Sequence, residues 1–228
     1  MKRTNLLYYA LLAGVLLGYA ACKKSFLTAQ PEGTQLESNY YQSPDEAFAG
    51  LVAAYNPLSW TVVSSYAPKM VLLTLASDEA TAGGGSNSDN PGMQAWNTYT
   101  LNAATPNVPP DLWSRNFTGI FRVNTMLQKV GSVPGLSSDL KTRYTAEMQF
   151  LRAYYYFDLV REFGNVPLIT AVLQQSQFFT QTQAKPADVY AQIEKDLNAA
   201  IPNLPATVDP ATEGGRVTKG AAQALLGK

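Results

Sequence analysis

The chain has 228 residues, of which 46% are hydrophobic and 15% are charged. This composition fits a folded domain and argues against a disordered chain. Its 17 basic and 17 acidic residues cancel, which argues against binding to nucleic acid, because such binding requires a basic surface. Histidine is absent, which excludes His-based catalytic triads, His metal sites and His proton shuttles.

The N-terminus predicts export and membrane anchoring. Two basic residues precede an apolar run from Leu6 to Ala21, whose 16 residues are short for a membrane-spanning helix of about 20. A basic start, an apolar middle and small residues at the end are typical of a secretory signal. Cys22, the only cysteine, follows directly. We therefore predict a lipoprotein signal peptide at 1–21 and a lipid-anchored linker at 22–42.

Lipidation of Cys22 would hold the protein at a membrane permanently, because each buried methylene of the acyl chains contributes about 0.8 kcal/mol. It would also leave no thiol for a disulfide, so that stability must come from packing. The alternative is an ordinary export signal with an incidental cysteine.

The first helix is predicted at about 44–56. Ser43 is a typical N-cap, Pro44 suits the first helical position, and Glu46 stands three residues after the cap. Apolar residues follow at helical spacing: Phe48, Leu51, Val52 and Tyr55.

Residues 77–112 are predicted to form a long irregular loop, because they lack apolar periodicity and contain GGGSNSDNPG. Loops of this length are often functional. The candidate ligand-binding residues lie in this loop: Asp78, Trp96, Asn97 and Tyr99. Trp96 and Tyr99 can share a face only in a helical or turned backbone. The alternatives are that Trp96 packs over the helices beneath it and that Asp78 caps or bridges.

Four more helices are predicted, and Pro, Ser, Thr and Gly residues mark their ends. They run from Pro110-Asp111 to Gly131, from Ser137 or Ser138 to Gly164, from Pro186 to Pro202, and from about Thr218 to Lys228. Trp113, near the start of the first of these, is expected in the core. The last helix ends with its apolar residues uncovered and without a C-cap. We therefore expect 43–228 to be a helical domain that is incomplete at its C-terminus.

Four consecutive aromatic residues, Tyr154 to Phe157, raise the question of whether they form a sugar-binding platform. At about 100° per residue their rings point in four directions and cannot form one face. Apolar residues occupy almost the whole circumference of this helix, which is typical of a helix packed between others. We therefore predict that this run is core. Arg152 is expected to pair with a carboxylate on a neighbouring helix.

Several motifs occur in an order that resembles the SusD/RagB family of Bacteroidetes. The lipoprotein start is followed by Phe26-Leu27, Ser77-Asp78-Glu79, Trp113 with Phe117-Thr118-Gly119-Ile120 and Asn124, Glu147 with Phe150 to Phe157, Phe163 to Leu168, Asp188-Val189-Tyr190, Ile193, Asp196-Leu197, Gly215 to Thr218 and Ala221 to Leu226. Together they cover nearly the whole mature chain. The blocks LRAYYYF and FGNVPL are the most specific of them.

The resemblance implies an all-α fold of tetratricopeptide-like helical pairs with long irregular loops. It also implies a lipid-anchored outer-membrane protein that faces the cell surface. Such a protein captures glycans or oligosaccharides and delivers them to a TonB-dependent, SusC-like transporter. The family serves carbohydrate uptake in polysaccharide utilization, and members are usually more than twice this length.

Two alternatives of the same helical architecture remain: a peptide-uptake protein and a protein-interaction scaffold. A hydrolytic enzyme is a distant third, because Cys22 is committed to lipid and no nucleophile can be activated by histidine. A carboxylate pair at glycosidase distance can arise by chance among 17 acidic residues. The stretch Asn87 to Asp89 lacks the ligand count of a calcium loop. We expect no catalytic residue, metal site or cofactor.

Overall fold

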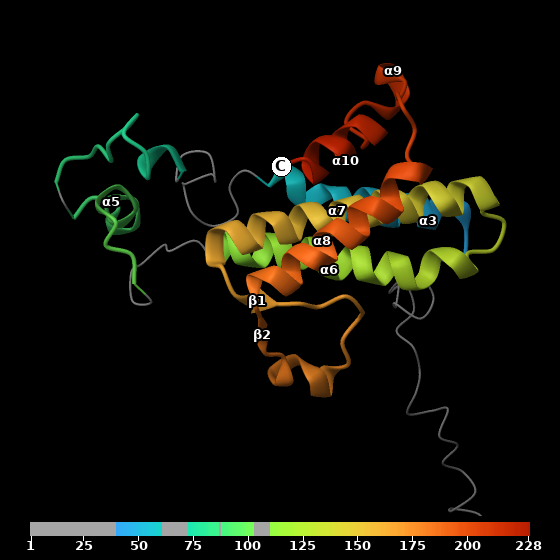
Figure 1. The fold of residues 1–228 in the computed structure, drawn as a ribbon, viewed down its shortest axis with the longest axis horizontal. Helices are drawn as coiled ribbons and strands as arrows, with labels where there is room; N and C mark the ends of the chain where they lie inside the picture. The colour runs from blue at the N-terminus through green and yellow to red at the C-terminus, as the bar shows by residue number, and fades with distance from the viewer. Residues whose placement is uncertain (1–39, 61–72, 87, 103–109) are drawn as a thin grey trace, which may run out of the picture. The chain divides into compact units, whose positions relative to one another are not determined.

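The computed structural model describes residues 40–60, 73–86, 88–102 and 110–228 (Figure 1). The predicted signal peptide and Cys22 lie outside these residues. Tyr41–Lys228 form one compact unit. Within the described part of the chain, no helix is both long enough and apolar enough to span a membrane.

The fold is all-α, as predicted. The α-helices are α3 Pro44–Tyr55, α5 Pro91–Thr98, α6 Pro110–Lys129, α7 Ser138–Phe163, α8 Pro186–Ala200, α9 Pro210–Glu213 and α10 Lys219–Leu226. Short 3-10 helices are η2 Asn56–Ser59, η3 Val130–Ser132, η4 Gln175–Thr180 and η5 Ile201–Asn203. The described residues contain one sheet, in which β1 (Val166–Pro167) pairs antiparallel with β2 (Gln183–Ala184).

Helix α7 lies at the centre of the core. It packs along α6 on one side and α8 on the other, α3 packs against α6 and α7, and α10 packs against α8 (Figure 1). The short connection between α6 and α7 makes them antiparallel neighbours. These contacts bury an apolar core that includes Leu51, Ile120, Met148, Leu159 and Leu197.

The helix starts follow the predicted capping residues. The side chain of Ser43 accepts a hydrogen bond from the backbone N–H of Glu46, and Ser137 and Thr218 cap α7 and α10 in the same way. Gly164 ends α7 with φ of 70°, a left-handed value that glycine adopts without steric cost. Local capping chemistry therefore sets these boundaries.

The aromatic run of α7 is core, as the helical wheel predicted. Tyr155 and Tyr156 are fully buried, Phe157 is buried, and Tyr154 is half-buried. The hydroxyl of Tyr155 donates to the carbonyl of Ala54 on α3 at 2.7 Å. Buried rings with satisfied hydroxyls join helices, and they offer no face to a ligand.

The carboxylate that was predicted to pair with Arg152, without being named, belongs to Asp196 on α8. The guanidinium makes two parallel bonds to this carboxylate, at 2.7 and 2.8 Å, and also donates to Asn124 on α6. A buried charge is tolerated only when it is paired in this way. This bidentate pair therefore ties three helices together.

Trp113 departs in part from its prediction as a core residue. It is half-buried and packs against Phe117 and, edge to face, Phe163, with ring centroids 4.7 and 5.2 Å away. The position near the start of α6 places the ring at the margin of the packed helices.

Candidate ligand-binding site

The prediction that 77–112 lacks regular structure is wrong for Pro91–Thr98, which form α5. Asn90 caps this helix by accepting from the N–H of Met93, and Pro91 occupies the first helical position. Tyr99 ends the helix in a left-handed conformation with φ of 56°. Such a backbone is uncommon for a bulky residue and stores strain at this position.

Asn97 organises the α5 segment, by which we mean residues 73–86 and 88–102. Its side-chain oxygen accepts from the N–H of Ala82 at 3.1 Å, and its side-chain nitrogen donates to the carbonyl of Leu75 at 3.3 Å. Gln94 donates to the carbonyl of Ala82 as well. The amide of Asn97 therefore positions the segment, and its contact with a ligand stays a prediction.

The structure brings Tyr99 to the turn that contains Asp78. The hydroxyl of Tyr99 donates to the carbonyl of Ala76, two residues before Asp78. Tyr99 is nevertheless 75% exposed, and Asp78 is exposed as well. A ring that is fixed at its hydroxyl and open along its face suits stacking on a ligand.

Trp96 is half-buried, which leaves open the alternative that its ring packs against its surroundings. Its indole nitrogen is buried and has no hydrogen-bond partner in the described part of the chain. An indole N–H only donates, so a hydrogen bond to an acceptor would remove the free-energy penalty of leaving this buried donor unsatisfied. Trp96 therefore combines a partly packed ring with one buried donor that is unsatisfied in the described part of the chain.

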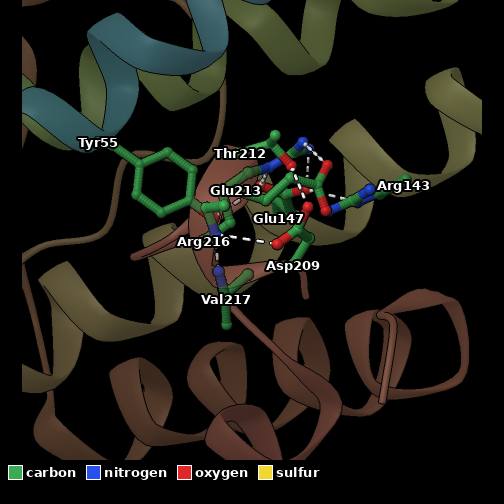
Figure 2. Close-up of polar contacts among 9 residues, drawn as sticks. Tyr55, Arg143, Glu147, Asp209, Thr212, Glu213, Arg216 and Val217 are labelled. Atoms are coloured by element: carbon green, nitrogen blue, oxygen red, sulfur yellow. Dashed lines mark hydrogen bonds and ion pairs between the residues drawn. The ribbon is translucent and has the colours of Figure 1, made fainter. Parts of the chain in front are cut away.

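A second candidate is a partly buried ionic cluster of two carboxylates and two guanidiniums, shown in Figure 2. We call Arg143, Glu147, Glu213 and Arg216 the ionic cluster. Glu147, on α7, is fully buried and accepts from Arg143 at 3.1 Å and from Arg216 at 3.2 Å. Glu213 accepts from the same two arginines, at 2.9 and 2.6 Å.

Tyr55 completes the contacts of this cluster. Its hydroxyl donates to Glu147 at 2.7 Å and accepts from the backbone N–H of Val217 at 3.1 Å (Figure 2). Burial, followed by the negative charge of Glu147, raises the pKa of Tyr55 well above its usual range. The cluster thereby connects α3, α7 and the segment that precedes α10.

The ionic cluster is suited to holding structure and unsuited to acid–base chemistry. The hydrogen bond from Arg143 lowers the pKa of Glu213 and keeps this carboxylate ionised. A general acid needs a raised carboxyl pKa, which positive partners oppose. The charges of the four residues cancel, so the cluster offers no net charge to a ligand.

A mostly apolar hollow of about 260 Å³ lies beside the cluster, between α3 and residues 212–216. Phe48 and Val52, which belong with Leu51 and Tyr55 to the apolar stripe of α3, are exposed at its wall. Only Leu51 of this stripe is fully buried.

Sequence reasoning missed the pairing within the cluster and the helix α5. Two signals were present. Arg143 and Glu147 are four residues apart, the spacing of an ion pair on one helix face. Asn90-Pro91 is an N-cap followed by the first helical position.

The packed antiparallel helices define an all-α protein, and its two most exposed aromatic residues in the described part of the chain, Tyr99 and Phe179, lie outside these packed helices. A sequence model described as "Starch-binding associating with outer membrane", SusD-like, matches residues 58–228. A SusD-like protein of Bacteroides ovatus is 30% identical, and the alignment covers 95% of this chain and 38% of that protein. A SusD-like protein of Formosa agariphila is 27% identical, over 90% of this chain and 39% of its own length.

Solved structures give the same result. A laminarin binding SusD-like protein has 43% sequence identity and a TM-score of 0.75, over 82% of this chain and 40% of the other. The surface glycan-binding protein A from Bacteroides uniformis has 27% identity and a TM-score of 0.73, over 81% of this chain and 41% of the other. The chain belongs to the SusD/RagB family of SusD-like proteins, and it spans about two fifths of the length of these relatives.

Proposed function

We propose that this chain belongs to a nutrient-binding lipoprotein of the outer membrane that captures neutral glycans or oligosaccharides. The observation that carries the proposal is the 43% identity to a laminarin binding SusD-like protein, over 82% of this chain. The name of another relative refers to glycans, and the description of the family model refers to starch.

The α5 segment is the proposed contact region. In this proposal Tyr99 supplies an open ring face, and the half-buried Trp96 supplies the edge of a second ring. Asn97 holds the segment in shape, and Asp78 lies in the turn beside Tyr99 and accepts from a sugar hydroxyl. Sugars present an apolar face and hydroxyls that both donate and accept, which suits such a surface.

The expected affinity of this contact is low. Two stacked rings at about 0.5–1.5 kcal/mol each, with a few hydrogen bonds of about 1 kcal/mol, give roughly 3–5 kcal/mol. That corresponds to a dissociation constant around millimolar. Weak capture suits a protein that must release its ligand to a transporter.

Delivery to a TonB-dependent, SusC-like transporter and anchoring through a lipid on Cys22 are part of the same proposal. The family description includes association with the outer membrane, and the N-terminal sequence predicts lipidation. In this proposal the protein binds and releases the glycan without cleaving it.

Electrophoresis of the full chain, purified in a mild nonionic detergent, through native gels that contain laminarin or soluble starch tests the binding. We expect retardation by at least one of them and its loss in Trp96→Ala and Tyr99→Ala. Unchanged mobility of the wild type in both gels would contradict the proposal, and sugar fragments released from the polymer would indicate a hydrolase.

Two further experiments test the other parts. Metabolic labelling with a fatty acid should mark the wild type and spare Cys22→Ser. Affinity purification from the native membrane should recover a TonB-dependent barrel protein. Recovery of the barrel without any glycan binding would favour the protein-interaction scaffold.

A further inference from the structure

The chain between α7 and α8 leaves the helices through β1, forms η4 and returns through β2 (Figure 1). Residues 163–184, which include this excursion, contain no charged residue. Residues 174–183 are made only of five glutamines, three serines or threonines, and two phenylalanines. We call residues 174–183 the projection.

The projection exposes both of its aromatic rings. Phe179 is 99% exposed and Phe178 is 55% exposed. A single exposed apolar side chain is common at a protein surface, whereas two adjacent rings form a small apolar patch of the kind that binding sites use. Side chains three apart in a 3-10 helix eclipse each other, so Ser176 lies beside Phe179 and Gln175 lies beside Phe178. Each ring therefore has a neutral hydrogen-bonding group next to it.

The projection is held in shape by its own side chains. The N–H of Gln174 donates to the side chain of Gln177 at 2.8 Å, and the reciprocal bond completes a capping box. Thr180 and Gln181 both donate to the carbonyl of Gln177, at 3.0 and 3.1 Å. The pairing of Val166 with Ala184 closes the base of the excursion. Preorganisation of this kind lowers the entropy lost on binding.

We propose that the projection is a second carbohydrate-contact site, in which Phe179 stacks on a sugar ring of a neutral polysaccharide and the neighbouring amides and hydroxyls pair with its hydroxyl groups. This inference shares its ligand class with the proposed function and adds a site that is independent of Trp96 and Tyr99.

The chemistry of the projection favours a neutral glycan over other partners. Amide and hydroxyl groups both donate and accept hydrogen bonds, as sugar hydroxyls do. A segment without Lys or Arg lacks the electrostatic attraction that draws loops to anionic lipid surfaces. The uncharged stretch of 22 residues also offers no charge with which to select a charged ligand.

A second site makes the binding of a long polymer multivalent. Its loss therefore weakens the binding of the polymer and leaves the affinity of the first site for short ligands unchanged. In native gels that contain laminarin or soluble starch, Phe179→Ala in the full chain should raise the apparent dissociation constant about three- to tenfold. Phe179→Tyr should keep wild-type retardation because the ring remains. Phe179→Leu should behave like Phe179→Ala, because it keeps apolar area but offers no ring.

Phe121→Ala is the matched control, since Phe121 on α6 is 53% exposed and lies outside the projection. It should leave retardation unchanged, and all variants should keep the wild-type melting temperature. A wild type that no neutral polysaccharide retards would overturn both this inference and the proposed function. Retardation that Trp96→Ala abolishes and Phe179→Ala leaves intact would overturn this inference alone.

Two outcomes would assign the projection to another partner. Wild-type retardation in Phe179→Leu would show apolar docking and overturn stacking. Co-sedimentation with phosphatidylethanolamine–phosphatidylglycerol vesicles that is lost in both Phe179→Ala and Phe179→Leu would identify a membrane surface and would equally overturn the glycan site.

Discussion

Helix α7 and the α5 segment both carry closely spaced aromatic residues, but the two regions differ in how far these residues are buried. Tyr155 and Tyr156 are fully buried between helices, with their hydroxyls bonded to backbone carbonyls. Tyr99 also bonds a backbone carbonyl, yet its side chain is 75% exposed and its backbone is left-handed. Aromatic content alone therefore does not identify a binding surface.

The difference follows from what surrounds each ring. Helix α7 has neighbours on several sides, so a ring in almost any direction meets another helix. Helix α5 has eight residues, and only Gly92 and Ala95 are buried in it. Rings in the first region stabilise the fold, and we propose that rings in the second contact ligand.

The largest expected effect comes from removing one ring of α7. Tyr155→Ala should lower the free energy of unfolding by about 3–5 kcal/mol, because it opens a cavity between α6, α7 and α3 and removes a buried hydrogen bond. Tyr99→Ala should change it by less than about 1 kcal/mol. Urea unfolding followed by circular dichroism measures both, and equal losses would break the comparison.

Glu147→Gln should have the next largest effect. It leaves Arg143 and Arg216 facing a neutral amide, and we expect a loss of roughly 1.5–3 kcal/mol in the same urea experiment. Glu194→Gln, on the exposed face of α8, is the matched control and should be near neutral. A neutral effect of Glu147→Gln would mean that the ionic cluster does not hold α3 and α7 to the segment before α10.

Asn97→Ala should act locally, since its two hydrogen bonds lie within the α5 segment. We expect a loss of about 1–2 kcal/mol in the local opening free energy. Native-state hydrogen exchange should show faster exchange at Ala82 and unchanged exchange in α7. Asn198→Ala, an exposed asparagine of α8, should alter neither, and loss of protection across α7 would contradict a local role.

The smallest expected effect concerns alkaline pH. Burial raises the pKa of Tyr55, Tyr155 and Tyr156 in the folded protein. Their stabilising contribution is therefore complete below about pH 10 and is lost as the pH rises further. In an ultraviolet titration these phenols should ionise only as the helical circular dichroism disappears. Ionisation of all tyrosines at their ordinary pKa in a folded protein would contradict the burial.

Much of the fold was predictable because its signals are local. Ser43, Ser137 and Gly164 indicate helix ends through their capping chemistry, and the angular distribution of apolar residues around α7 predicts burial on every side. The partner of Arg152 was predictable only as a carboxylate. Asp196 is 44 residues away, and nothing local specifies which helix will face α7.

The candidate site was less predictable for a physical reason. Helix α5 buries too few side chains to create apolar periodicity, so only its cap, Asn90-Pro91, marked it. Asn97 is predicted from the sequence as a ligand-binding residue, but its bonds to Leu75 and Ala82 could not be predicted, because they depend on how the loop folds back. The left-handed backbone of Tyr99 has no sequence signal, because a glycine or asparagine is expected there.

The most direct test of the central claim is a ring-resolved NMR titration of the full chain in detergent with a short laminarin oligosaccharide. The account predicts that the ring signals of Trp96 and Tyr99 shift with saturation at around millimolar ligand, while those of Tyr155 and Tyr156 stay in place. Shifts at Tyr155 and Tyr156, with none at Trp96 and Tyr99, would contradict it.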